Sequence, residues 1–226
     1  IESLSGGEDD KINWMLKNMH KNKAYEFHSH NKTEKEKNKI LQDFKDRYVD
    51  YRRKWRDQPK DAFKKELYGK KFEQEQLSPL CFDIEIASIC DLACAFCYRQ
   101  YVSTPDKIMK KELAFKLIDQ ASKLNVPSMK FNWRGEPLLN PQAHNIIYYA
   151  KKMGILETIM NSNATKLDNK TAEKIIKSGL DLLIYSFDGG TKNMYEKMRP
   201  GRFSKNNFDV VYKNIVNFSK IKKKIK

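Results

Sequence analysis

The chain has 226 residues and a mass of 26.7 kDa, enough for one good-sized domain or for a small domain with an arm. Hydrophobic residues make up 40% of it and aromatic residues 12%, which supplies the bulk for a core. The absence of an apolar run of about 18 residues excludes a membrane-spanning helix. Four cysteines are few, and three lie within eight residues, which argues against a disulfide scaffold.

The 44 basic and 29 acidic residues give a net charge of +15. A strongly basic chain can bind nucleic acid or another anion. Here acidic residues are interleaved with the lysines, and only residues 220–226 form a basic run. We therefore interpret the charge as solvated helix faces, and we expect neither a nucleic-acid nor a membrane partner. The chain begins with Ile1 and ends within a predicted helix, so we expect part of a longer protein. We also expect a cytoplasmic location.

The first 78 residues are predicted to form a polar, helical arm. Residues 1–31 are polar and irregular, with a short amphipathic stretch at 12–19. Thr33 and Glu36 form a capping box, which predicts the start of a helix. Pro59 is predicted to end that helix, and residues 61–68 favour a second, shorter one before Gly69. The first of these helices has one apolar face with three- and four-residue spacing, made of Ile40, Leu41, Phe44, Tyr48, Tyr51 and Trp55.

Residues 79–226 alternate between strand and helix patterns. Helices are predicted at 112–124 and 142–153, after Asp168 as far as Gly179, and at 208–221, with Asp168 and Gly179 as end signals. Such alternation predicts an α/β fold of parallel strands joined by right-handed crossovers. Four units of this kind make half to two-thirds of a (β/α) barrel. The four strands are predicted at 82–86, 129–133, 158–161 and 182–187.

Three cysteines follow the first predicted strand with C-x3-C-x2-C spacing: Cys90, Cys94 and Cys97. Three thiolates on one loop can hold one inorganic centre, and soft sulfur ligands favour zinc, Cu(I) or an iron–sulfur cluster. A structural zinc site normally has four ligands, whereas Cys81 lies on a strand that carries it away from the loop. A [4Fe–4S] cluster on three cysteines would leave one iron open to a small molecule.

This loop resembles the signature of the radical S-adenosylmethionine (radical SAM) superfamily, with Phe96 in the aromatic position before the last cysteine. Three further motifs come at the carboxyl ends of later strands, where a (β/α) barrel builds its site. They are Arg-Gly-Glu-Pro at 134–137, where Arg134 replaces the more usual first glycine, Asn-Ser-Asn-Ala-Thr at 161–165, and Ser-Phe-Asp-Gly at 186–189. The chain looks closest to the subgroup that carries a SPASM or twitch extension. The resemblance implies a partial (β/α) barrel of the radical SAM type, truncated after about four units.

The resemblance also implies a cofactor site and a reaction. The three cysteines would hold a [4Fe–4S] cluster, and S-adenosylmethionine (AdoMet) would chelate the open iron. Reduction by an electron donor such as flavodoxin or ferredoxin would cleave AdoMet to a 5′-deoxyadenosyl radical, which abstracts hydrogen from a peptide, a sugar or a small metabolite. Arg199 or Arg202 would pair with the AdoMet carboxylate. The other residues implied to contact AdoMet are Phe96, Tyr98, Gly135, Glu136, Asn163, Ser186 and Asp188.

Two other functions compete with this enzyme. A zinc-stabilised, basic nucleic-acid-binding module would hold one zinc and bind in a salt-dependent manner, but the three cysteines lack a nearby fourth partner. A non-catalytic barrel could act as a scaffold for a partner. Asp83 and Glu85 alternate with the apolar face of the first strand, so they are expected to point into the barrel, with a role in substrate contact or in structure.

Overall fold

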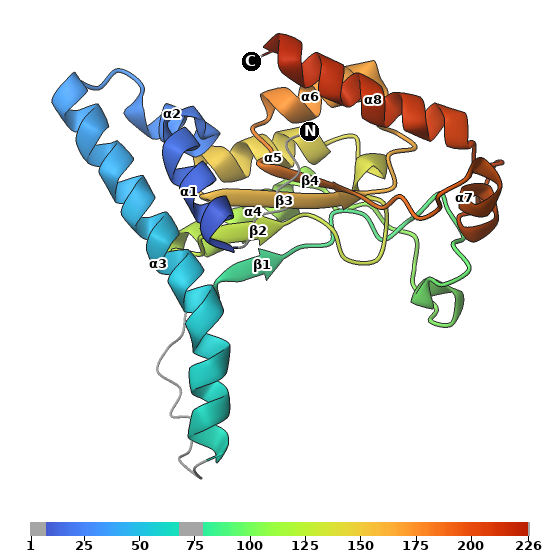
Figure 1. Ribbon diagram of the computed structural model, residues 1–226, viewed down its shortest axis with the longest axis horizontal. Helices are drawn as coiled ribbons and strands as arrows, with labels where there is room; N and C mark the ends of the chain where they lie inside the picture. Colours follow the sequence, from blue (N-terminus) through green and yellow to red (C-terminus); the bar gives the residue numbers. More distant parts are fainter. Residues whose placement is uncertain (1–7, 68–78, 226) are drawn as a thin grey trace.

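The computed structural model describes residues 8–67 and 79–225. Its centre is a four-stranded sheet in the order β1-β2-β3-β4, with every neighbouring pair parallel (Figure 1). Strands that are neighbours in both sequence and space form the wall of a (β/α) barrel, so the predicted α/β partial barrel is confirmed. The strands are β1 Cys81–Asp83, β2 Ser128–Lys130, β3 Glu157–Ser162 and β4 Leu182–Tyr185.

Four helices connect these strands or follow them, and they pack on one face of the sheet. Met129 in β2, Phe131 just after it and Met160 in β3 are fully buried against them, because successive side chains of an extended segment point to opposite faces. The register puts Asp83, Lys130 and Ile159 in one row, on the face away from those core residues. The helices are α4 Lys111–Lys123, α5 Ala143–Lys152, α6 Asn169–Lys177 and α8 Phe208–Ile225.

The predicted end signals of α6 are confirmed. The side chain of Asp168 accepts a hydrogen bond from the Thr171 N–H at 2.7 Å, so it caps the first turn. Gly179 follows the helix with φ at +84°, a left-handed conformation that glycine adopts without a steric cost.

The N-terminal region lies at the amino ends of the strands, opposite the edge where the strands finish (Figure 1). It has its own apolar cluster, which includes Met19, Phe44 and Tyr48 and reaches Leu156 beside β3. Asn22 donates to the Leu156 carbonyl at 3.0 Å and to Asp181 at 3.2 Å. The elements are α1 Glu8–Asn18, a 3-10 turn η1 Met19–Lys21, α2 Lys23–Ser29 and α3 Glu34–Leu67.

Two sequence predictions for this region are wrong. Residues 8–29 are helical, because packing of Met15 and Met19 outweighs their polar surroundings. Helix α3 also continues through Pro59. A proline removes one backbone hydrogen bond and crowds the preceding turn, but good helix formers on both sides sustain the helix.

Some sequence predictions lie outside the described residues, namely those for 1–7, for Tyr68 and Gly69, and for the boundary at 78. None of the described helices combines the length and the apolar character needed to cross a membrane.

Candidate functional site

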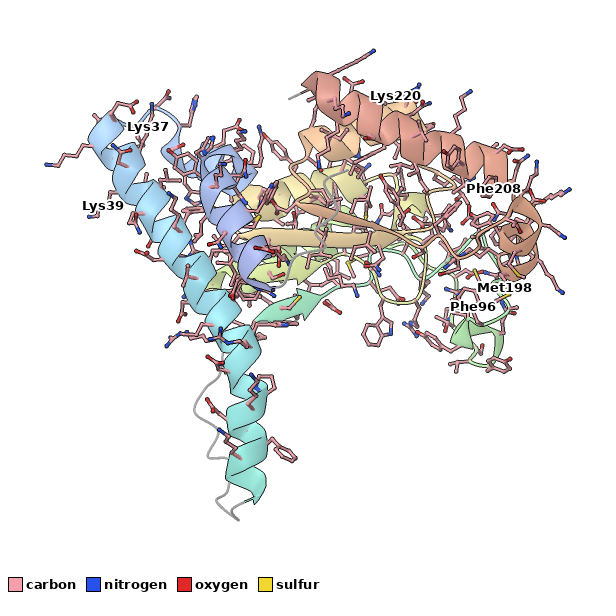
Figure 2. The ribbon with its side chains drawn as sticks, in the orientation of Figure 1. Lys37, Lys39, Phe96, Met198, Phe208 and Lys220 are labelled. Atoms are coloured by element: carbon pink, nitrogen blue, oxygen red, sulfur yellow. The ribbon has the colours of Figure 1, made fainter. Side chains whose placement is uncertain are left out.

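The cysteine loop lies at the carboxyl edge of the sheet and is held by a distant segment. Residues 91–95 run alongside residues 198–202, with the Ala93 N–H donating to the Pro200 carbonyl at 2.8 Å and the Ala95 N–H to the Met198 carbonyl at 3.1 Å. Figure 2 shows Phe96 and Met198 close together at this edge. The second segment follows helix α7 Lys192–Met198, which the sequence did not predict, so β4 and its loop contribute to the site.

The three thiols lie in partly or fully buried positions on this loop. Cys94 is 7% exposed, and its carbonyl accepts from the Cys97 N–H at 3.0 Å. Burial raises the pKa of the Cys90 thiol to about 11, with further contributions from the Glu136 and Asp91 carboxylates. Burial also raises the pKa of Cys94, against the nearby Arg199 cation. A metal centre has to displace these protons, which couples its binding to pH.

Asp91 fixes the cysteine loop to the end of β3. Its carboxylate accepts from the Asn163 side-chain amide at 2.8 Å and from the Thr165 hydroxyl at 2.6 Å. The same amide of Asn163 points at the Cys90 sulfur, 3.9 Å away. The predicted residue Asn163 therefore touches the loop, whereas the contribution of Asp91 was missed. In the sequence, Asp91 is marked only by its position directly after Cys90, and that position does not show which residues it binds.

The structure separates the two candidate arginines. Arg199 is 7% exposed, and its Nε donates to the Asp188 carboxylate at 2.7 Å. Its Nη1 lies 3.5 Å from the Cys94 sulfur, and its guanidinium lies 5.1 Å from the centre of the Phe96 ring. Arg202 instead pairs with the exposed Asp106 at 2.8 Å. Only Arg199 lies where it can meet both the cysteine loop and the end of β4.

Gly135 sits where a side chain has no room. A Cβ atom there would lie 2.2 Å from the Ala87 carbonyl oxygen and 2.5 Å from that of Ile89. The next residue, Glu136, donates its N–H to the same Ile89 carbonyl at 2.9 Å. Glycine thus lets the turn after β2 pack directly on the backbone that leads into Cys90.

Glu136 is turned into the protein. Its carboxylate accepts from the Asn163 N–H at 2.7 Å, the Ser162 hydroxyl at 2.8 Å and the Leu138 N–H at 3.0 Å. Burial raises the pKa of this carboxyl to about 7, although these three hydrogen bonds oppose the shift. The side chain therefore joins the turns after β2 and β3 and so sets the position of Asn163.

Arg134, the departure from the usual motif, binds Glu85. Its backbone N–H donates to one Glu85 oxygen at 2.9 Å, and its guanidinium contacts both oxygens, the shortest distance being 2.6 Å. These contacts lower the pKa of Glu85 although burial acts against them. Glu85 is thus in an ion pair, whereas Asp83 is exposed at the end of β1.

The remaining predicted residues lie at the same edge. Phe96 and Tyr98 are about half exposed, with Tyr98 in a short 3-10 turn, η2 Tyr98–Gln100. The Ser186 N–H donates to the Ser162 carbonyl at 2.8 Å, which continues the pairing of β3 and β4. The aromatic rings flank the cysteine loop, and Ser186 lies beyond the end of β4.

The donor set fits an iron–sulfur cluster. No group of three or more Cys, His, Asp or Glu side chains within the described ranges is arranged to hold a single metal ion. In a [4Fe–4S] cluster each thiolate binds a different iron, so the sulfurs need not converge on one point. Three thiols on one loop can each ligate one iron of such a cluster, and the Asn163 and Arg199 side chains donate to two of the sulfurs, a contact that tunes a cluster's reduction potential.

Comparisons with known proteins give one consistent family. The model of the Radical SAM superfamily matches residues 84–224, more than half of the chain. Among curated proteins, the chain is 31% identical over 108 residues to the tungsten-containing aldehyde ferredoxin oxidoreductase cofactor-modifying protein of Pyrococcus furiosus, covering 46% of this chain and 30% of that protein. It is 28% identical over 122 residues to GTP 3′,8-cyclase of Clostridium botulinum, covering 52% and 38%. The matches thus span less than two-fifths of these relatives.

Solved structures show the same fold. The structure of anSMEcpe with bound AdoMet aligns with a TM-score of 0.55 at 22% identity, covering 64% of this chain and 42% of that one. Streptococcus suis SuiB, bound to the precursor peptide SuiA, aligns with a TM-score of 0.54 at 17% identity, covering 94% and 44%.

Members of the matched family use a [4Fe–4S] cluster and AdoMet. The cysteine loop, the four-stranded parallel sheet and the match over residues 84–224 all agree. The chain belongs to the radical SAM superfamily.

Proposed function

We propose that this chain is the core of a radical SAM enzyme that holds a [4Fe–4S] cluster on Cys90, Cys94 and Cys97 and binds AdoMet beside it. The observation that carries the proposal is the contact of Arg199 with both the Cys94 sulfur and Asp188. This contact supports the proposal because it brings a cation that can pair with a carboxylate to one of the three thiols, beside which the amino-acid end of AdoMet would lie.

The chain's own residues would orient AdoMet. Asp188 holds the Arg199 guanidinium through Nε and Nη2, and the remaining N–H groups of the guanidinium would donate to the ligand carboxylate. Backbone carbonyls of the turn at Gly135 would accept from the ligand's amino group, because this turn packs directly against the approach to Cys90. Phe96 and Tyr98 present the aromatic surface on which the adenine would pack.

The fixed loop supports this chemistry by positioning. When bound and reduced, the cluster with AdoMet supplies a radical that removes a hydrogen atom from the substrate. Asp91, Asn163 and Glu136 form a connected set of hydrogen bonds from the loop to the ends of β2 and β3. Such bracing holds the reacting groups at a productive distance.

The reductant would be a small electron carrier such as flavodoxin or ferredoxin. The substrate would be a peptide, a sugar or a small metabolite. A peptide is supported by the likeness to SuiB, which binds its precursor peptide SuiA, and a metabolite by the likeness to GTP 3′,8-cyclase. The loop's resemblance to the SPASM or twitch subgroup supports placing the whole protein among enzymes with auxiliary clusters.

Anaerobic reconstitution with iron and sulfide tests the proposal. We expect about four irons per chain and, after reduction, an EPR spectrum that changes on addition of AdoMet. Replacement of Cys90, Cys94 or Cys97 by alanine should abolish cluster assembly. Cys81→Ala is the matched control and should assemble a normal cluster, because this thiol lies on β1 beside Asp83.

Two results would contradict the proposal. Stoichiometric zinc without a cluster would indicate a structural metal site and a binding role. A cluster whose EPR spectrum does not change on addition of AdoMet would indicate a scaffold in place of an enzyme.

A further inference from the structure

A pocket of about 460 Å³ adjoins the candidate cofactor site without including any of its cysteines. Glu85 and Ser88, which follow β1, form one side, and Arg134 after β2 forms another. The segment 104–110 and the first turn of α4 complete it. Arg134 directly precedes Gly135, which packs on the backbone just before Cys90. The pocket therefore lies next to the segment that leads into the cysteine loop.

The far wall of the pocket is fixed by backbone pairing to the segment that follows β1. Residues 107–109 pair in antiparallel fashion beside β1 through the Ala87–Ile108 bridge, and the Ser88 N–H donates to the Lys107 carbonyl at 2.9 Å. The Ser88 hydroxyl donates to the Pro105 carbonyl at 2.6 Å and accepts from the Lys107 N–H at 3.0 Å. The pocket is therefore formed before a ligand arrives, which lowers the entropic cost of binding.

The lining carries excess positive charge. Its cations are Lys107, Lys110 and Arg134, and its carboxylate is Glu85, which Arg134 already binds through both oxygens. Within residues 8–67 and 79–225, neither Lys107 nor Lys110 forms an ion pair, whereas many other lysines do so with acidic neighbours. Two lysines of the lining thus have no counter-charge among the described residues.

Two further features add hydrogen-bond donors at the same place. The Thr104 hydroxyl is buried in the lining and finds no partner among the described residues. Helix α4 starts at the pocket, and its N-cap residue Lys110 provides no side-chain cap. The Leu113 N–H donates to the Lys110 carbonyl at 3.1 Å, and the N–H groups of Lys111 and Glu112, which have no acceptor among the described residues, are left for an anion. Ile108 and Leu113 give the pocket an apolar side.

We propose that this pocket binds an anionic group of the substrate, a carboxylate or a phosphate, through Lys107, Lys110 and the Thr104 hydroxyl. The apolar side then contacts the carbon skeleton next to that group. The identification of the ligand as the substrate rests on the proposed function. The anion site itself does not, because its binding can be measured without a cluster.

The test is calorimetric titration of the cluster-free chain at constant ionic strength. Inorganic pyrophosphate and succinate serve as the phosphate and carboxylate probes, and the tighter of the two identifies the anion class. The variant K107Q/K110Q should weaken the binding at least tenfold. The matched control K116Q/K123Q removes the same charge from α4 outside the pocket and should change the dissociation constant less than twofold.

Glu85→Gln provides a change of opposite sign. Loss of this carboxylate frees the Arg134 guanidinium, so we expect anion binding to tighten at least threefold in a variant whose circular dichroism is unchanged. The proposal is overturned if neither probe saturates, if both lysine pairs weaken binding equally, or if a folded Glu85→Gln variant binds more weakly. None of these results affects the iron content or the AdoMet response of the reconstituted protein, so the two proposals fail separately.

Discussion

Replacement of Gly135 by alanine should destabilise the protein by steric conflict alone. The new Cβ would meet two carbonyl oxygens at 2.2 and 2.5 Å and the Ser88 carbonyl carbon at 2.7 Å. These are backbone atoms, so the turn itself has to move away. Overpacking of this kind costs about 1–3 kcal/mol. The displacement also stretches the Glu136–Ile89 hydrogen bond, worth about 1 kcal/mol, and we expect a total loss of about 2–4 kcal/mol.

Urea unfolding followed by circular dichroism measures this loss. Gly190→Ala is the matched control, because a Cβ at Gly190 meets nothing within 4 Å, and its unfolding free energy should stay within about 1 kcal/mol of the parent. Gly135→Ala should also reduce iron incorporation, since the turn presses on the backbone just before Cys90. A Gly135→Ala protein as stable as the control would refute the close packing inferred here.

Three further predictions concern charged residues. Because burial raises the pKa of Glu136 from 4.5 to about 7, the folded protein keeps a proton that the unfolded chain releases. The free energy of unfolding of the parent, measured relative to that of Glu136→Gln, should therefore fall by about 3 kcal/mol as the pH rises from the lower to the higher of these pKa values. If urea unfolding gives the same difference between the two proteins at both pH values, this reasoning is contradicted. Lys151→Met leaves the partly buried Asp181 carboxylate without its cation and should cost about 3 kcal/mol; an unchanged midpoint in thermal melts would contradict this. Arg199→Gln should weaken AdoMet binding to the reconstituted protein at least tenfold and Arg202→Gln less than twofold, and an equal effect in equilibrium dialysis would remove the distinction between them.

Local signals in the sequence determined most of the secondary structure. The capping box is present, with the Thr33 N–H donating to the Glu36 carboxylate at 2.8 Å and the Glu36 N–H to the Thr33 hydroxyl at 3.3 Å. Alternation along the first predicted strand gave its apolar side, and Ile84 and Ile86 of that side are buried in the core. Such signals act over two to four residues, so they can be read without knowledge of the fold. These local signals carry no information about long-range packing, which is why helices α1 and α2 were not predicted.

The cysteine spacing likewise indicated the family, because three ligands on one loop are a local feature. Which residues support that loop was decided by tertiary structure. Asp91, Glu136 and Arg199 act on partners up to 105 residues away, and only the parallel arrangement brings the ends of β1 to β4 to one edge. The choice of Arg199 over Arg202 depends on how the segment after α7 folds back on the cysteine loop. Sequence thus indicated the family, and the packing of distant segments decided which side chains contact the cysteine loop, because contact between them depends on position in space and leaves no periodic trace along the chain.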